Sequence, residues 1–229
     1  KKPEPEGKPV CWPELPVTPF QRRVLAQLTT TLSGPGREAA ASGETIFEGK
    51  WSTQKYPFFG DHRIQNRVVV PGATYAAWAL SLFPGQLQLL FETPLALEEE
   101  TTVQMVFSRE KKQIQFFAKT GTDWVRHAEG TWQAQKIPLE KGETPAEIQK
   151  RLIEISPDEL YRGYEERGIT LGPSFRRIQR LWKGEGEALG EILSPEGMKI
   201  HPAALDAATG VAGALCSPET GLFLPSQYE

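Results

Sequence analysis

Residues 72–83 (GATYAAWALSLF) constrain the fold more than any other segment, because they are apolar around almost the whole circumference of a helix. The segment follows Pro71 and stops at Pro84-Gly85, which are signals for the start and the end of a helix. A helix without a polar face is stable only when it is buried. The flanking segments partly alternate polar and apolar residues, which is typical of strands. We therefore expect a sheet wrapped around this helix.

Strand signals dominate the chain from residue 45 to residue 135. The segments that predict strands are TIFEGKWS, QLQLLFETPLAL, TVQMVFS, QIQFFAK and DWVRHAEGTWQAQ. The third and fourth are joined by the polar residues 109–112 (REKK), which predict a hairpin connection. These strands would supply the sheet around the apolar helix.

The order of signals repeats loosely in the second half of the chain. A helix is expected after Ser156-Pro157, strands in FRRIQRLWKGEGEALGEIL, and another strongly apolar helix in HPAALDAATGVAGAL. The halves share no sequence identity, so the repeat is one of architecture. The prediction is an α+β fold of two units, each an antiparallel sheet around one buried helix.

Composition shifts predict the domain boundaries. Residues 1–43 are rich in proline, charge and small residues and are expected to be a linker, in which CWPELPVTPFQRR docks on a neighbouring surface. The first unit is expected over 44–136, a polar connection over 137–151 and the second unit over 152–229. The second unit is shorter, and the sequence stops at LPSQYE, where a further strand is expected.

Charge and cysteine usage argue against several classes of function. The 26 Lys and Arg against 29 Asp and Glu give a net charge of −3 without a basic block, so neither nucleic acid nor a membrane surface is expected as a partner. Cys11 and Cys216 form no disulfide framework and no zinc-ligand spacing, which favours a reducing compartment. With no apolar run near the roughly 18 residues that span a bilayer and no signal core, we expect a cytoplasmic location.

The three histidines are candidates for acid–base chemistry. His62 is expected in a loop that feeds a strand, where it is either a surface residue or a general base. His127 is expected in a strand, exposed or half-buried. His201 precedes Pro202 at the start of a helix, where capping or packing is the expected role.

Asp206 is the most informative polar residue of the second apolar helix. Only Asp206 and Thr209 are polar in PAALDAATGVAGALC. If Pro202 is the first helical residue, Asp206 lies in the second turn, beyond most of the helix dipole, and burial would raise its pKa. Asp206 is then either paired with an arginine or a backbone amide, or kept protonated as a proton donor. Cys216 has no nearby base in sequence and is expected to be a packing residue.

Three segments, in order, resemble motifs of the dehydratase domain of modular polyketide synthases and animal fatty acid synthase. HRIQNRVVVP (62–71) resembles HxxxGxxxxP, GITLGPSF (168–175) is similar to GxxYGPxF, and HPAALDAATG (201–210) resembles HPxxLDxxxQ. The resemblance covers roughly residues 44 to 229. LPVTPFQRR is also similar to the segment that follows the acyltransferase in such synthases.

This resemblance implies a double hotdog, two antiparallel sheets each wrapped around a helix, with the second hotdog incomplete in this sequence. It implies elimination of water from a β-hydroxyacyl thioester on the phosphopantetheine arm of an acyl carrier protein. His62 would remove the α-proton and Asp206 would protonate the leaving hydroxyl. No metal or diffusible cofactor is needed, and the implied partners are the carrier protein, neighbouring synthase domains and a second copy of the chain. The substrate-binding residues implied by matching motif positions are Asn66, Pro71, Gly72, Leu171, Gly172, Pro173 and Gly210.

Three positions depart from the motifs. Asn66 replaces a glycine, Leu171 a tyrosine and Gly210 a glutamine or histidine. Asparagine tolerates a positive φ, whereas the other two changes remove hydrogen-bonding side chains that would orient the acid. They leave open a family variant that forms cyclic ethers or shifts the double bond, and a catalytically silent structural domain. Because Asp206 and Pro71 are present, dehydration is the favoured interpretation.

Overall fold

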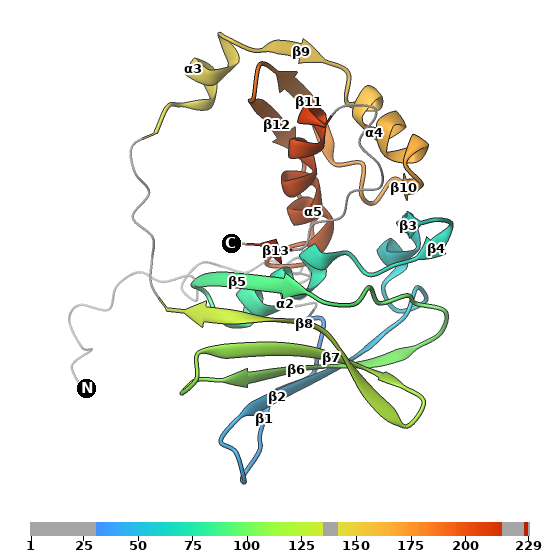
Figure 1. The fold of residues 1–229 in the computed structure, drawn as a ribbon, viewed down its shortest axis with the longest axis vertical. Helices are drawn as coiled ribbons and strands as arrows, with labels where there is room; N and C mark the ends of the chain where they lie inside the picture. The colour runs from blue at the N-terminus through green and yellow to red at the C-terminus, as the bar shows by residue number, and fades with distance from the viewer. Residues whose placement is uncertain (1–30, 135–141, 217–226, 229) are drawn as a thin grey trace, which may run out of the picture.

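The computed structural model describes residues 31–134, 142–216 and 227–228 (Figure 1). Most of the predicted N-terminal linker, with Cys11 and CWPELPVTPFQRR, lies outside the described residues, as do part of the 137–151 connection and most of LPSQYE. No helix within the described ranges is long and apolar enough to cross a membrane.

The first unit is built on an antiparallel sheet that has seven strands among the described residues, in the order β1-β2-β6-β7-β8-β5-β13. All five predicted strand segments of this region are confirmed, and the predicted hairpin at 109–112 pairs β6 with β7, with Ser108 opposite Gln113. The strands are β1 (Arg37–Glu38), β2 (Thr45–Trp51), β5 (Gln86–Phe91), β6 (Thr101–Ser108), β7 (Gln113–Thr120), β8 (Asp123–Gln133) and β13 (Gln227–Tyr228). Two of these strands, β1 and β13, lie outside residues 44–136, and β13 comes from the end of the chain.

The predicted apolar helix is α2 (Gly72–Leu82), and every residue from Ala73 to Ala79 is buried. Its aromatic side chains pack on rings of the sheet: Trp78 lies 5.3 Å from Trp51, measured between ring centroids. Because no face of α2 is polar, the sheet encloses it and builds the largest part of the hydrophobic core. The end of the predicted linker joins this core, since Leu32 is buried and its carbonyl accepts a hydrogen bond from Trp51 Nε1 at 2.9 Å.

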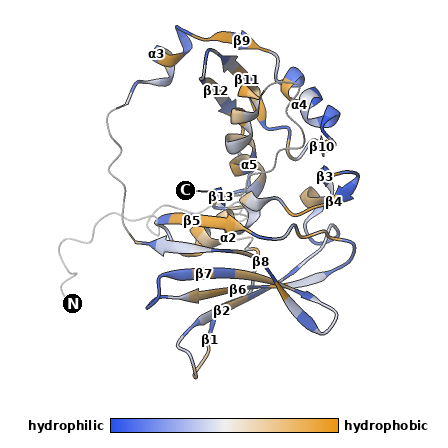
Figure 2. Ribbon diagram, in the orientation of Figure 1, coloured by the Kyte–Doolittle hydropathy of each residue, from blue (hydrophilic) through white to orange (hydrophobic). Residues whose placement is uncertain are grey.

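The second unit is smaller, with a three-stranded antiparallel sheet in the order β12-β11-β9. Both predicted helices are present, but the second turns into a 3-10 helix after Gly210, so it is shorter than predicted. Helix α5 packs against α2. Much of α4 consists of hydrophilic residues (Figure 2). The elements are β9 (Ile153–Ile155), α4 (Pro157–Glu166), β11 (Ile178–Lys183), β12 (Ala188–Ile192), α5 (Pro202–Gly210) and the 3-10 helix η3 (Val211–Leu215).

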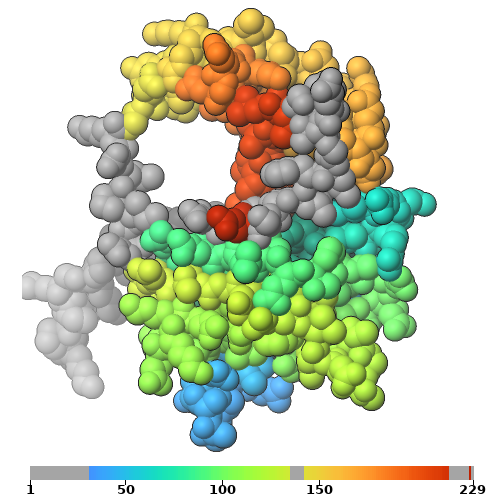
Figure 3. Space-filling view, viewed as in Figure 1, coloured from blue at the N-terminus to red at the C-terminus, as the bar shows by residue number. Residues whose placement is uncertain are grey.

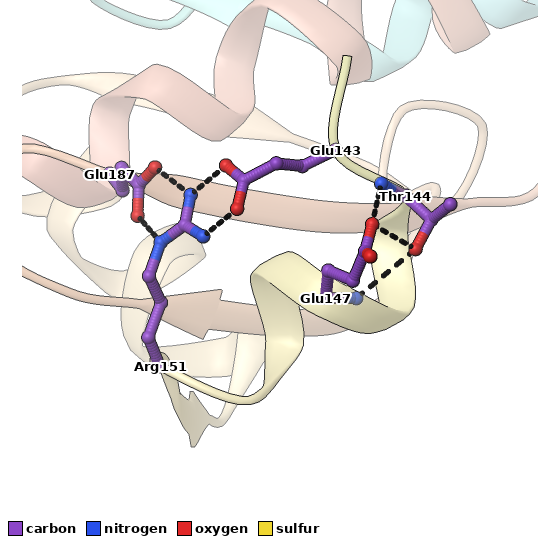
Figure 4. A network of polar contacts seen from close by, with 5 residues as sticks. All are labelled: Glu143, Thr144, Glu147, Arg151 and Glu187. Carbon is purple, nitrogen blue, oxygen red and sulfur yellow. Dashed lines mark hydrogen bonds and ion pairs between the residues drawn. The ribbon is translucent and has the colours of Figure 1, made fainter. Parts of the chain in front are cut away.

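The connection between the units contains a short helix that the sequence reading did not predict, α3 (Pro145–Gln149). Thr144 and Glu147 form a reciprocal capping box at its start. Arg151 then binds Glu143 and, at the turn between β11 and β12, Glu187, with N–O distances of 2.7 and 2.6 Å (Figure 4). These contacts attach the described part of the connection to the second unit.

A third, small sheet joins the units and positions the candidate site. It contains β3 (His62–Ile64), β4 (Arg67–Val68) and β10 (Ile169–Leu171), in the order β10-β3-β4. Strand β10 of the second unit pairs antiparallel with β3, which places Leu171 opposite His62. In Figure 3 the residues of β3 and β4 lie between the large body of the first unit and the smaller body of the second.

Candidate active site

His62 is the first residue of β3 and directly follows the 3-10 helix η2 (Pro57–Asp61), not a loop as predicted. Its side chain is 8% exposed, so the surface alternative is wrong. Nδ1 lies 2.7 Å from the carbonyl oxygen of Val69, and because a carbonyl only accepts, Nδ1–H is the donor. In the neutral ring this leaves Nε2 as the nitrogen with a free lone pair, which a general base requires.

Asp206 lies in the second turn of α5, as predicted. His201 caps this helix, because its Nδ1 accepts a hydrogen bond from the N–H of Ala203 at 3.1 Å, which confirms the predicted role. Desolvation raises the pKa of the half-buried Asp206 carboxyl, and the nearby charge of His62 opposes that rise. An aspartic acid with a raised pKa is suited to donating a proton.

His62 and Asp206 both line two cavities. The first, here called the α4 cavity, has a volume of about 280 Å³ and is bounded by α4, β10 and α5. The second, the α2 cavity, has a volume of about 290 Å³ and is bounded by the start of α2, the end of β5 and β8. The pair therefore lies where a ligand that reaches into both cavities would pass.

Some of the other predicted substrate-binding residues line one of the two cavities, and the rest line neither. Pro71 and Gly72 line the α2 cavity, and Leu171 and Gly210 line the α4 cavity. Neither cavity is lined by Asn66, Gly172 or Pro173.

Asn66 occupies the turn between β3 and β4. Its φ is 65°, a positive value that asparagine tolerates, as glycine does at the matching position of the motif. Its side chain is exposed, and its carbonyl accepts a hydrogen bond from Arg63 Nη1 at 3.2 Å. Asn66 thus shapes the hairpin that begins with His62.

Gly172 lies against the residue that precedes His62. Its N–H donates to the carbonyl of Asp61 at 2.7 Å. A Cβ on Gly172 would come within 2.4 Å of Asp61 Oδ1, so a larger residue would push the two segments apart.

Tyr164 is a site residue that the sequence reading missed. Its hydroxyl donates to the carbonyl of Gly210 at 2.5 Å, and its ring lines the α4 cavity with Asp206. A Cβ on Gly213 would lie 2.2 Å from this hydroxyl, so small residues in α5 and η3 make room for it. Desolvation and the charge of Asp206 raise the Tyr164 pKa, so the phenol stays protonated. A tyrosine hydroxyl is therefore present although residue 171 is leucine.

His127 is buried, contrary to the prediction of an exposed or half-buried position. A β-bulge explains the difference: Phe116 pairs with Ala128 and Phe117 with Arg126, so His127 is the extra residue of β8 and turns inward beside Ala128. It lines the α2 cavity.

Cys216 lies just beyond η3 rather than inside a helix, and lines the α4 cavity. Among the residues that the structure describes, no three His, Cys, Asp or Glu side chains are grouped so that they could hold a metal ion.

Comparison with known proteins gives consistent matches. The family model described as polyketide synthase dehydratase domain matches residues 32–119, and the model described as polyketide synthase dehydratase N-terminal domain matches residues 140–229. The spectinabilin polyketide synthase system protein NorA' of Streptomyces orinoci is 28% identical over 242 residues, which cover 85% of this chain. This chain spans only 6% of that protein.

Solved structures give the same result. The dehydratase domain from the CurJ module of curacin polyketide synthase is 32% identical, with a TM-score of 0.67 over 80% of this chain and 72% of that one. Two structures of the CurK dehydratase have TM-scores of 0.72 and 0.69 at 26% and 27% identity. They cover 86% and 82% of this chain and 78% and 75% of their own. Both are described as inactive mutants, one with phenylalanine for a histidine and one with asparagine for an aspartate.

Proposed function

The chain belongs to the dehydratase domains of polyketide synthases, and we propose that it eliminates water from a β-hydroxyacyl thioester carried on the phosphopantetheine arm of an acyl carrier protein. The observation that supports this most is the shared position of His62 and Asp206. An unprotonated Nε2 and a carboxyl with a raised pKa, from different halves of the chain, line the same two cavities. A base and an acid that meet in this way suit an elimination.

In the proposed reaction His62 Nε2 takes the proton from the α-carbon. The electrons of that C–H bond form the α,β double bond, and the bond between the β-carbon and the hydroxyl oxygen breaks. Asp206 gives its proton to the departing hydroxyl, which leaves as water. The site then holds an imidazolium and a carboxylate, and return of one proton from His62 to Asp206 restores it.

The start of α2 is placed to polarise the thioester carbonyl, the third function that the proposed reaction needs. The first N–H groups of a helix have no partner inside the helix and favour a partial negative charge. Gly72 lines the α2 cavity with the pair, so we infer that these N–H groups polarise the thioester carbonyl. A Cβ at Gly72 would lie 2.7 Å from the Phe91 ring, so a side chain there would disturb this end of α2. Acid and base both come from the chain, and the proposed reaction uses no metal or diffusible cofactor.

We also propose the fold and the partners that the dehydratase family implies. The sheet around α2 and the sheet beside α5 support a double hotdog. The carrier protein and the neighbouring synthase domains are the proposed partners. A second copy of the chain as a dimer partner and a cytoplasmic location stay predictions.

Intact-mass analysis of a β-hydroxyacyl carrier protein incubated with the domain tests this function. Incubation with wild type should lower the mass of the acylated carrier protein by that of one water. Incubation with His62→Phe or Asp206→Asn should leave the mass unchanged. Asp123→Asn, at the exposed first residue of β8, is the matched control and should keep full activity. Circular dichroism checks that each variant is folded.

The conjugated enoyl product, a product with a shifted double bond and a cyclic ether have the same mass, so the retention time of the product against enoyl standards distinguishes these alternatives. A shifted double bond would support the isomerising family variant, and a cyclic ether would support the ring-forming one. No change of mass with folded wild type and several chain lengths would support a silent structural domain and overturn the proposal.

A further inference from the structure

The α2 cavity contains two buried polar atoms that the reaction above does not use. The hydroxyl of Tyr75 and Nε2 of His127 have no hydrogen-bond partner among the described residues. Tyr75 is 3% exposed and His127 is 5% exposed, and both line the cavity with His62 and Asp206. Because buried polar groups are nearly always hydrogen-bonded, two unpaired atoms on side chains that line one cavity point to a ligand.

The backbone of β8 directs His127 to this position. In a regular strand His127 and Ala128 would face opposite sides of the sheet, yet both are buried. The bulge turns both residues inward, and bulges of this kind often re-aim a side chain beside an active site. The hydrogen bond from Nδ1 to the Thr93 carbonyl, at 2.7 Å, is enough to hold the ring in place. A purely structural role therefore gives no use to Nε2.

The two free atoms have opposite hydrogen-bonding character. Nδ1–H of His127 donates to Thr93, and burial lowers the His127 pKa, so the neutral ring offers Nε2 as an acceptor. Burial raises the pKa of Tyr75, so its hydroxyl remains a donor. A hydroxyl group can accept a hydrogen bond from one and donate to the other.

We propose that Tyr75 and His127 form a polar subsite that binds a hydroxyl group of the acyl chain beside the His62–Asp206 pair. The identity of the ligand as a thioester-linked chain rests on the proposed function. The subsite would favour chains with a hydroxyl at the matching carbon over chains without one. Two sources of that hydroxyl are open: the β-hydroxyl that is eliminated, and a second hydroxyl further along the chain.

Two substitutions remove the free atoms and leave the rest of the site unchanged. Tyr75→Phe deletes only the unpaired hydroxyl and keeps the ring, whose centroid lies 5.0 Å from that of Phe116. His127→Asn keeps an amide donor for the Thr93 carbonyl, because the asparagine nitrogen takes the place of Nδ1, and removes the Nε2 acceptor.

The first experiment measures binding without reaction. Isothermal titration calorimetry compares N-acetylcysteamine thioesters of a six-carbon chain with no hydroxyl, with a β-hydroxyl and with a δ-hydroxyl, all three being titrated into the His62→Phe background so that none is turned over. The His62→Phe protein should bind at least one hydroxylated thioester about tenfold more tightly than the plain one, and adding Tyr75→Phe or His127→Asn should abolish that preference.

The compound that binds most tightly identifies which hydroxyl group of the substrate the subsite binds. Preference for the δ-hydroxyl thioester assigns the subsite to the chain, and preference for the β-hydroxyl thioester assigns it to the leaving group. Equal binding of all three compounds in the His62→Phe background, or a preference that survives both added substitutions, would overturn the proposal. Since this test needs no turnover, a domain that fails to dehydrate would still report on the subsite.

Thermal unfolding separates binding from a structural role. Tyr75→Phe removes an unpaired buried hydroxyl, so its unfolding temperature should equal or exceed that of wild type. A clear fall would mean that the hydroxyl stabilises the fold and would contradict the proposed subsite.

Discussion

Oδ2 of Asp61, the residue before His62, accepts a 2.8 Å hydrogen bond from the N–H of Ser174, 113 positions further along the chain. The N–H of Gly172 also donates to the Asp61 carbonyl. These two bonds lie beside the pairing of β10 with β3. The proposed base is therefore positioned by contacts with the half of the chain that supplies the proposed acid.

Asp61→Ala should weaken both stability and activity. The Ser174 N–H loses its partner, which should lower the free energy of unfolding by about 1–3 kcal/mol. A displaced His62 should lower kcat/KM by about tenfold or more. Urea denaturation and steady-state kinetics measure the two effects. Asp61→Asn, which keeps an acceptor oxygen, is the control, and an equal loss with this variant would contradict the role of the bond.

Gly213→Ala should destabilise the domain by about 1–3 kcal/mol, because its Cβ would overlap the Tyr164 hydroxyl. Tyr164→Phe removes that oxygen and should recover part of the loss, so the two changes should be non-additive in a double-mutant cycle. Gly142→Ala, where a Cβ meets no atom within 4 Å, is the control. Full additivity would contradict the packing described for Tyr164.

Asp206→Asn should be more stable than wild type at neutral pH, although the proposed reaction requires it to be inactive. The folded state raises the Asp206 pKa, so it binds the proton more tightly than the unfolded state does, and stability falls as the pH rises above the ordinary aspartate value. Asparagine carries no such penalty. We expect a gain of about 1 kcal/mol at pH 7 that shrinks toward pH 4, measured by urea denaturation. A gain independent of pH would point to another cause.

His201 should make the domain sensitive to acid. Burial, with a smaller contribution from the charge of Arg177, lowers the His201 pKa to about 4, so between the ordinary value of 6.5 and pH 4 the unfolded state binds more protons. Stability present above pH 6.5 is lost as the pH falls through this window, by up to about 3 kcal/mol. His201→Asn keeps a helix-capping oxygen and should flatten the dependence. An unchanged slope would exclude His201 as its source.

Sequence patterns predicted the strands and both apolar helices because local periodicity decides which residues are buried. They also made His62 and Asp206 candidates, and the motif resemblance paired them; the structure places both on the same two cavities. The inward turn of His127 was not predictable, since a bulge breaks the alternation on which the prediction rests. The role of Tyr164 was missed because it depends on two glycines nearly fifty positions away, a relation that appears only when α4 and α5 pack together.

The pairing of β3 with β10 also has a consequence for folding kinetics. Closing so long a loop is slow compared with forming the hairpins of the large sheet, whose partners are close in sequence. During refolding, burial of Trp51 and Trp78 inside the first sheet should precede the meeting of acid and base. Catalytic activity would then report the last step of assembly, and tryptophan fluorescence an earlier one.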